Sequence, residues 1–361
     1  MKTAKTDNFL FYPKPQVDRD VLLNIPSHSQ KVDQWKEILE NRLGIEVNKN
    51  NLVFADPVNI WGVVNPALLE LCTADLHVPG FNIYLKIRDS FSSCVDVSPN
   101  DWLDVLLFGA EMHPVMAHQI LTRNNHQNSA IAAKRSNVNL IQIYDWYNQD
   151  IIIDMLKSKL KIQPRKMFAR DTKVKQITQT EANKFLAYYH MQGATKKQSY
   201  CLGLFDKHSN ELLQVQTFGP SRFDKNYEWE AIRLASKFGV TIVGGVSKGF
   251  HRFLKDKNPQ SVISYVDADR SMGVTDEETG FKFVRSTTPS IYWIDPFGMD
   301  KKPYRNTSLQ SMGIDKLLDM DPSGFPDYDK QDKSTSNTAL MFKNGYARIF
   351  TSGSFVYEWR K

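Results

Sequence analysis

The spacing of apolar residues in the first part of the chain predicts one helix and a pair of strands. In residues 29–43 (SQKVDQWKEILENRL) the apolar positions recur at helical spacing, and Ser29 can cap the helix. In residues 75–87 (DLHVPGFNIYLKI) polar and apolar positions alternate on both sides of Pro79–Gly80. This alternation predicts a strand, a tight turn and a second strand.

The next segments predict a buried strand and a helix, followed by a break. Residues 139–144 (NLIQIY) have the composition of a short buried strand, and residues 151–160 have the pattern of an amphipathic helix. Pro164 is incompatible with continuation of that helix. We therefore place a domain boundary within residues 161–175.

The second half of the chain alternates strands and helices, which predicts an α/β fold with mixed sheets and flanking helices. Residues 228–238 are expected to pass from strand into helix, and 346–350 with 354–359 to form a final hairpin. The acidic segment 315–336, rich in Pro, Gly and Ser, is expected to be a loop. Further helices are expected at 180–190 and 247–255, and further strands at 199–205, 212–218, 240–243, 262–266, 281–284 and 291–294.

The composition is that of an ordinary globular chain. Its 361 residues are 41% hydrophobic and 24% charged, which suits about two domains of roughly 150 residues. No run of about 18 apolar residues is present, and residues 1–15 lack the apolar segment of a signal peptide. We therefore expect a cytoplasmic protein with no membrane partner. The three cysteines form no CxxC pair, so free thiols are favoured over a zinc site.

Positive charge is concentrated in one segment. The net charge is only +6, but residues 157–175 contain eight Lys and Arg residues, opposed by Asp171 alone. Such a segment is typical either of a solvated face or of a surface that follows nucleic-acid phosphates.

A glycine pair in TIVGGVSKGFHRFL (241–254) is the first candidate site. A buried strand ends at Gly244 and Gly245, and a helix begins near Ser247 with Lys248 beside it. Free N–H groups at a helix N-terminus and a close backbone approach suit a phosphate or pyrophosphate. The Walker A spacing is absent, and a tight strand-to-helix turn without a ligand is the alternative.

A second candidate site follows the strand in ISYVDADRSMG (263–273). The strand delivers Asp267, Asp269 and Arg270 to its C-terminal end, which is where α/β sheets bind ligands. Asp267 could serve as a general base, or an Asp–Arg pair could simply order the loop. His190, in YYHMQG, is either a second functional group or a histidine at a helix C-terminus.

The ordered motifs of the second half resemble a known pattern. They resemble the C-terminal domain behind Vsr-like homing endonucleases of large phages, which is similar to the GNAT acyltransferase fold of Mom-type DNA modification proteins. This resemblance implies that Gly244, Gly245, Ser247 and Lys248 bind the pyrophosphate of an acyl-CoA. Met272 replaces a histidine that is frequent in that family. The motifs include KMFARDTKVKQI (166–177), YCLGLF (200–205), TIVGGVSKGFHRFL, VISYVDADRSMG (262–273), GFKFVRSTTPSIYWID (280–295) and GYARIFTSGSFVYEW (345–359).

The first half is similar to the Vsr-like nuclease itself, through CTADLHVPGFNIYLKI (72–87) and IAAKRSNVNLIQIYDWY (131–147). In that family carboxylates hold a divalent metal, such as Mg²⁺, that activates water. The resemblance implies Asp75 as a catalytic residue and metal ligand, and Lys134 as a catalytic residue from the similar Lys-containing helix. Asp89, as a catalytic residue, and Asp96, as a metal ligand, could substitute for a missing family carboxylate. Lys86 stands where the family has a glutamate, and an ammonium group repels Mg²⁺, so we expect an eroded centre. Glu37, His113, His118 and Asp145 are further candidates.

These observations lead to a domain division and a ranked set of functions. The division is an irregular lead (1–28), a nuclease-derived domain (29–160), a basic linker (161–175), a GNAT-like domain (176–310), and an acidic loop with the final hairpin (311–361). We expect first a phage-type DNA-binding protein in the cytoplasm of an infected bacterium. The alternatives are an active metal-dependent endonuclease, an acyl-CoA-using DNA modification enzyme, and an adaptor for a phage or host protein. The expected DNA contacts are Lys157, Lys159, Lys161, Arg165, Lys166, Arg170, Lys173, Lys196, Lys197, Arg222 and Arg270.

Overall fold

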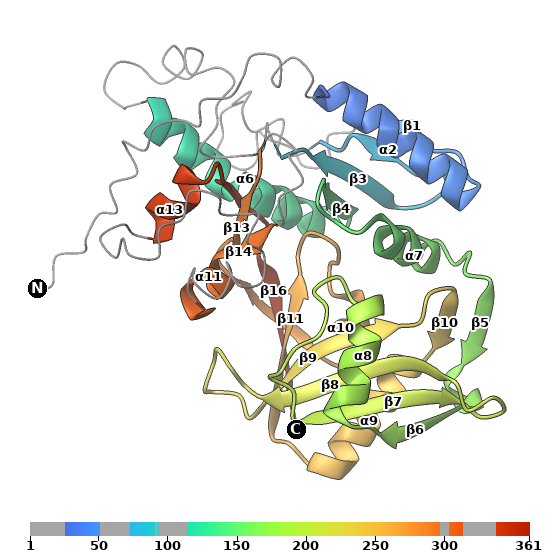
Figure 1. The fold of residues 1–361 in the computed structure, drawn as a ribbon. Helices are drawn as coiled ribbons and strands as arrows, with labels where there is room; N and C mark the ends of the chain where they lie inside the picture. The colour runs from blue at the N-terminus through green and yellow to red at the C-terminus, as the bar shows by residue number, and fades with distance from the viewer. Residues whose placement is uncertain (1–25, 51–72, 91–92, 94–113, 297–302, 313–336) are drawn as a thin grey trace, which may run out of the picture.

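Strands and helices alternate along the chain and form a mixed α/β structure, as expected. The computed structural model describes residues 26–50, 73–90, 93, 114–296, 303–312 and 337–361, and every structural statement below refers to these residues. Figure 1 shows a smaller N-terminal part above a larger C-terminal sheet. We call residues 26–160 the N-terminal half and residues 161–361 the C-terminal half. The expected loop 315–336 lies outside the described residues.

The N-terminal half is a four-stranded sheet between helices. Its strand order is β1-β2-β3-β4, from β1 (Asn48–Lys49), β2 (Leu76–His77), β3 (Ile83–Arg88) and β4 (Asn139–Tyr144). Strands β3 and β4 run parallel and are joined through α6 (Pro114–Arg135). Helix α2 (His28–Leu43) and helix α7 (Gln149–Lys159) complete this half.

Helix α2 begins with a capping box and ends at a glycine. The Ser27 hydroxyl accepts a hydrogen bond from the Gln30 N–H, and the Gln30 side chain accepts one from the Ser27 N–H. Ser27, not the expected Ser29, is therefore the N-cap, because Ser29 already lies inside the first turn. Gly44 adopts φ 66°, a conformation that glycine takes without steric cost.

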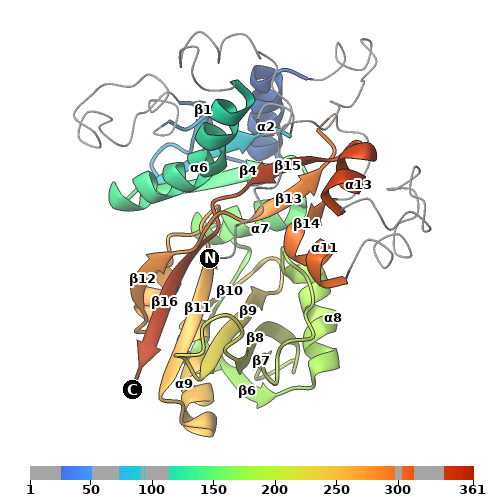
Figure 2. The same ribbon diagram turned by 90° about the vertical axis from the view of Figure 1, so that its left-hand side faces the viewer.

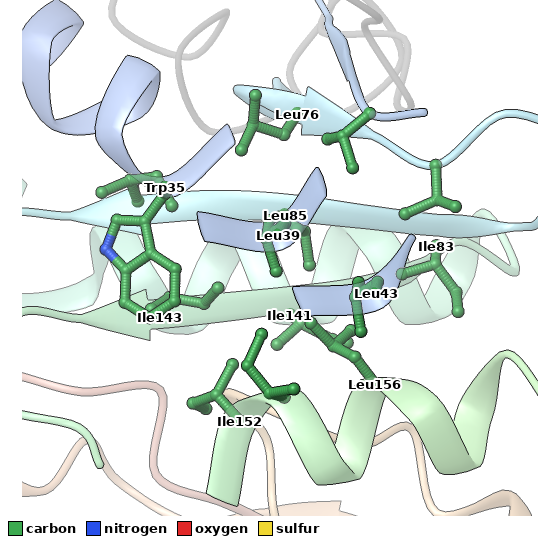
Figure 3. Close-up of a cluster of buried hydrophobic side chains, with 14 of the residues drawn as sticks. Trp35, Leu39, Leu43, Leu76, Ile83, Leu85, Ile141, Ile143, Ile152 and Leu156 are labelled. Atoms are coloured by element: carbon green, nitrogen blue, oxygen red, sulfur yellow. The ribbon is translucent and has the colours of Figure 1, made fainter. Parts of the chain in front are cut away.

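The core of this half forms where α2 and α7 pack on the sheet (Figure 3). Trp35 and Leu39 of α2 meet Leu85 of β3, Ile141 of β4 and Leu156 of α7. All five side chains are buried. Residues 139–144 form the buried strand β4, as expected. The alternation expected for residues 83–87 does not appear as an exposed face, because β3 is buried at almost every position.

The C-terminal half is built on a seven-stranded sheet in the order β12-β16-β11-β9-β8-β7-β6. Only β9 and β11 are parallel neighbours in it, and they are connected by α9 (Gly245–Lys257). Helix α8 (Gln179–Tyr189) packs beside Cys201 and Val215, whereas α9 packs beside Tyr200 and Leu202. Because neighbouring residues of a strand face opposite ways, α8 and α9 cover opposite faces. The strands are β6 (Thr172–Gln176), β7 (Tyr200–Asp206), β8 (Leu212–Pro220), β9 (Trp229–Ser236), β11 (Ser261–Asp267), β12 (Lys282–Ser286) and β16 (Ser354–Arg360).

Strands β9 and β11 separate after three paired residues. Val262, Ile263 and Ser264 of β11 pair with Trp229, Glu230 and Ala231 of β9, and the pairing stops there although both strands continue. At the same point β9 bulges against β8: Thr217 pairs with Arg233 and Phe218 pairs with Ala231. Ile232 is the extra residue, so the sheet opens between two of its central strands.

Two smaller sheets flank the large one. Strand β5 (Arg165–Phe168) pairs in parallel with β10 (Val240–Val243). Strand β13 (Ile291–Ile294) lies between β14 (Tyr304–Arg305) and β15 (Ala347–Phe350), next to α11 (Asn306–Met312) and α13 (Asn337–Lys343). The segment expected as a basic linker thus contributes β5, a 3₁₀ turn at Ala169–Asp171, and β6.

Two expectations about this half were wrong. Residues 229–236 are strand throughout, with no passage into helix, because both edges of β9 are taken up by β8 and β11 at its start. The last two strands form no hairpin: β15 pairs with β13, and β16 pairs with β11 and β12. Figure 2 shows β15 and β16 following one another through different sheets.

A buried polar network joins the two halves. Asp269, on the loop after β11, accepts hydrogen bonds from the Tyr144 hydroxyl of β4 (3.0 Å) and from the Ser352 N–H (3.1 Å). The Gln142 side chain donates to the Ser352 hydroxyl (2.6 Å) and accepts from Arg88 (2.8 Å). Burial and the charge of Asp267 raise the pKa of Asp269 to about 7. Within the described part of the chain, no helix is both long and apolar enough to cross a membrane.

Candidate functional site

A pocket of about 290 Å³ passes through the seven-stranded sheet where β9 and β11 separate. Its lining comes from both faces of the sheet. Thr217, Arg233 and Tyr265 belong to the face covered by α8, because they alternate with residues that pack against α9. Phe218 and Phe250 line it from the α9 side. The pocket therefore has a polar end on the α8 side of the sheet. At its other end, on the α9 side, Phe218 and Phe250 lie beside the polar side chains of Ser264 and Asp276.

The polar end holds buried hydrogen-bonding atoms that have no partner. These are the Thr217 hydroxyl, the Tyr265 hydroxyl and the Nε atoms of Arg233 and Arg270. Native proteins leave few such atoms unsatisfied. Four of them around one pocket mark it as a place where a ligand or ordered water can supply the missing partners.

The polar end of the pocket combines an arginine–aspartate ion pair with a neutral histidine. Arg270 forms an ion pair with Asp267, and burial alone would lower the pKa of Arg270, but the Asp267 carboxylate raises it. Burial, with the charges of Arg233 and Arg270, lowers the pKa of His190 to about 3. The His190 Nδ1 atom accepts a hydrogen bond from the Gln192 N–H at 3.0 Å. His190 is therefore neutral at pH 7 and can accept a proton only weakly until the local charge changes.

The other end of the pocket adjoins the start of α9. Gly244 adopts φ 73° as the N-cap, and no side chain caps the helix. Buried Gly245 packs against Ile242 and Gln214, where a Cβ atom would overlap Ile242. The Gln216 side chain donates to the carbonyl oxygens of Gly245 (3.1 Å) and Val246 (3.3 Å). Glutamines of β8 thus fix the first turn of α9 beside the pocket.

One of the proposed phosphate ligands already has partners. The Lys248 ammonium group donates to the carbonyl oxygens of Ala169 and Thr172. Lys248 therefore ties the turn between β5 and β6 to α9.

A second cluster of charges lies in the N-terminal half. Asp75 is bonded to His28 (3.3 Å), Lys86 (3.3 Å) and the Ile87 N–H (2.7 Å). Asp89 lies 3.5 Å from His28 and 3.6 Å from Lys31. The third carboxylate, of Asp145, accepts from the Lys31 ammonium at 2.9 Å and from the Ser90 N–H at 2.8 Å. Three carboxylates are thus surrounded by three basic side chains.

These contacts shift the titration of the cluster. Burial alone would raise the pKa of Asp75, but the hydrogen bond from His28 and the charge of Lys86 lower it. Hydrogen bonds to Asp75 and Asp89 raise the pKa of His28 to about 9. Among the described residues, no three His, Cys, Asp or Glu side chains are arranged to hold a metal ion. Asp96 and His113 lie outside the described residues.

Lys134 lies apart from this acidic cluster. Its ammonium group contacts the Met272 carbonyl oxygen (2.7 Å), the Tyr357 hydroxyl (2.6 Å) and Glu277 (3.2 Å). It also lies 5.1 to 5.4 Å from the ring centres of Phe283, Phe355 and Tyr357. Lys134 therefore joins α6 to the C-terminal half.

The expected DNA-contacting residues fall into three groups. Three arginines are paired with carboxylates: Arg165 with Asp206 and Glu211, Arg222 with Glu230, and Arg270 with Asp267. Burial lowers the pKa of Lys159, and Lys157 is half-buried. The exposed members are Lys161, Lys166, Arg170, Lys173, Lys196 and Lys197.

The sequence indicated some of these side chains and not others. Asp267, Arg270 and His190 were singled out and do line the pocket. Thr217, Tyr265 and His28 were not, because one hydroxyl in an apolar strand, or a histidine near a helix start, gives no motif. Their role depends on which residues, distant in the sequence, lie next to them in the folded chain.

Comparison with known proteins adds no assignment. No protein-family model matches the chain. No curated protein matches it either.

Proposed function

We propose that the pocket is the active site of a GNAT-type group-transfer enzyme that uses an acyl-CoA. The observation that carries this proposal is the separation of β9 from β11 after three residue pairs, with a pocket passing between them. The strand order, with this one parallel pair connected through α9, supports the same interpretation. Such a site holds two reactants on opposite sides of a sheet.

The chain's own groups fit an acyl-CoA. The edges of β9 and β11 beyond Ala231 and Ser264 leave main-chain polar groups facing the gap, and an extended ligand with amide groups can bond to them. The uncapped first turn of α9 favours an anion such as a pyrophosphate. When bound, the cofactor supplies an acyl group activated as a thioester.

At the polar end the protein would bind and deprotonate the acceptor. Asp267 lines the pocket and is the group there that would take the proton. His190, with its pKa lowered to about 3, would orient the acceptor as a neutral ring. The Arg270 side chain holds Asp267 through its ion pair. Thr217 and Tyr265 offer hydroxyl groups to orient the acceptor.

Titration calorimetry of the full chain with acetyl-CoA tests the proposal. We expect saturable binding that Ala231→Trp weakens at least about tenfold, because the indole would fill the gap beside β11. Lys207→Trp, at an exposed turn, is the matched control. Absence of heat at high micromolar acetyl-CoA, or equal affinity of both variants, contradicts the proposal.

A second candidate function is DNA binding, and a strip on the surface favours it. Lys166 and Phe168 are the exposed residues of β5, and the Arg170 guanidinium lies 4.8 Å from the Phe168 ring centre. Lys173 and Lys175 are exposed on the adjoining β6. Basic side chains interleaved with an aromatic ring suit phosphates and a stacked base.

Salt dependence tests this second function. If the strip contacts phosphates, the logarithm of affinity falls linearly with the logarithm of salt concentration. Replacing Lys166 and Lys173 by Gln should reduce the slope by about 0.9 for each phosphate that is no longer neutralised. The matched control is Lys184→Gln, on the exposed side of α8. A flat salt dependence, or equal slopes for the two variants, contradicts it.

The proposed DNA-binding function includes no cleavage by the acidic cluster. Lys86 and His28 both contact the Oδ1 atom of Asp75, and the Ile87 N–H donates to its Oδ2 atom. The Lys31 ammonium group pairs with Asp89 and Asp145. Incubation of DNA with the protein and Mg²⁺ or Mn²⁺ tests this. Cleavage abolished by Asp75→Ala would favour the endonuclease instead.

A further inference from the structure

Arg233 is a buried guanidinium with no acidic partner. Its Nη1 atom donates to the Ile232 carbonyl oxygen at 3.0 Å, and its Nε atom is buried without a hydrogen-bond partner. Two neighbouring arginines, Arg222 and Arg270, each have a carboxylate partner. No carboxylate of the described residues forms an ion pair with Arg233. The remaining N–H groups of its guanidinium can therefore bond to a ligand in the pocket that Arg233 lines.

The surroundings of Arg233 favour an anion. Burial, and then the charges of Arg222, Arg305 and Arg270, lower the pKa of Arg233 to about 10, so it remains charged at pH 7. At the polar end of the pocket, Asp267 offsets the charge of Arg270, and His190 is neutral. Among the described lining residues, no carboxylate at this end pairs with Arg233, so this end favours an anion.

We propose that Arg233 binds a carboxylate group, either on the transferred acyl unit or on its acceptor, and so makes the site specific for carboxylate-bearing ligands. A guanidinium edge matches the two oxygens of a carboxylate in one plane. The unpartnered hydroxyl groups of Thr217 and Tyr265 can complete its hydrogen bonds. If the carboxylate is on the acyl unit, the inference rests on the proposed acyl-CoA function. Binding of a carboxylate by Arg233 does not in itself depend on that function.

Affinity measurements with three probes test the proposal on the full chain. The probes are acetyl-CoA, succinyl-CoA and free succinate, each with wild type, Arg233→Gln and Arg285→Gln. Arg285 is the matched control, since its side chain is 49% exposed. If the carboxylate lies on the acyl group, succinyl-CoA should bind at least about tenfold more tightly than acetyl-CoA. Arg233→Gln should abolish that preference by weakening succinyl-CoA binding more than acetyl-CoA binding, whereas Arg285→Gln should keep it.

The other outcomes show whether the carboxylate belongs to the acyl group or to the acceptor, and they test the acyl-CoA function separately from the carboxylate site. If both CoA esters bind alike but succinate raises the melting temperature of wild type and not of Arg233→Gln, the carboxylate belongs to the acceptor. If neither ester binds, the acyl-CoA function fails, and the succinate measurement alone decides the carboxylate site. If no carboxylate binding depends on Arg233, the inference is overturned.

Stability of the ligand-free variant distinguishes binding from a structural role. A buried charge without a partner destabilises the fold, so Arg233→Gln should melt at the same temperature as wild type or higher. A residue that supports the fold would show the opposite. A lower melting temperature, together with equally weakened binding of all three probes, would assign Arg233 a structural role and overturn the proposal.

Discussion

The ammonium nitrogen of Lys86 lies 3.3 Å from the Oδ1 atom of Asp75, and both side chains are nearly buried. A buried ion pair tolerates the removal of one partner poorly, because the other charge is left in an apolar environment. Lys86→Met keeps the length of the side chain and removes the charge. We expect it to lower the free energy of unfolding by about 2 kcal/mol, measured by urea denaturation.

Lys49→Met is the matched control for this substitution. Lys49 pairs with Asp33 at 2.6 Å, but both side chains are more than half exposed. Exposed pairs contribute below about 1 kcal/mol. Equal effects of the two substitutions would mean that the contact between Lys86 and Asp75 contributes no more than a surface ion pair.

The same cluster predicts a pH dependence through His28. Its pKa rises from 6.5 to about 9 on folding, because the charged ring is bonded to Asp75 and Asp89. A raised folded-state pKa gives stabilisation that is complete below pH 6.5 and is lost as the pH rises to about 9. The His28 side chain is 42% exposed, so solvent screening reduces the expected effect to about 1 kcal/mol.

Urea denaturation of wild type and His28→Gln from pH 6 to pH 10 measures this effect. The difference in unfolding free energy should be largest at pH 6 and should vanish above about pH 9. Other titrating groups are common to both proteins and cancel in the difference. A difference that stays constant over this range would show that His28 stabilises the fold without its charge.

Local elements were largely predictable from the sequence, and their pairing was not. Residues 139–144 form a strand over that same range, and the helix expected at 180–190 is α8 at Gln179–Tyr189. Both depend on periodicity and caps, which are local. The partner of β15 is β13, more than fifty residues away, and nothing in the sequence near β15 selects it over β16.

The candidate site shows the same limit. The glycine pair and the Asp267–Arg270 segment have recognisable local patterns, and both lie at or beside the pocket. The lack of an acidic partner for Arg233 is a property of the folded structure, because it depends on Asp267 and Glu230 being taken by other arginines. Sequence alone gives no account of which ion pairs form.

Lys134 predicts a measurable link between the two halves. Its ammonium group donates to the Met272 carbonyl oxygen and the Tyr357 hydroxyl and lies over three aromatic rings. Lys134→Met removes the charge, and hydrogen bonds from charged groups contribute about 1.5–3 kcal/mol each. We expect the free energy of unfolding to fall by about 3 kcal/mol in thermal or urea denaturation, counting the cation–π contacts.

The neighbouring Arg135→Met, at an exposed position, is the control and should change the free energy of unfolding by less than about 0.5 kcal/mol. Similar values for both variants would contradict the link.

Gly249 provides a test in which two physical effects predict opposite signs. It lies inside α9, where alanine is favoured over glycine by about 1 kcal/mol. A Cβ atom at this position would overlap the amide group of Gln216, which is buried and bonded to the Gly245 carbonyl oxygen.

Overpacking of this kind costs about 1–3 kcal/mol, and displacing Gln216 also breaks its hydrogen bonds. We therefore expect Gly249→Ala to lower the free energy of unfolding by about 1–2 kcal/mol. It should also weaken acetyl-CoA binding, because Gln216 lines the pocket. Ser158→Ala, exposed on α7, should be neutral or slightly stabilising. A Gly249→Ala protein more stable than wild type would show that Gln216 moves aside freely, and that the first turn of α9 is not fixed by it.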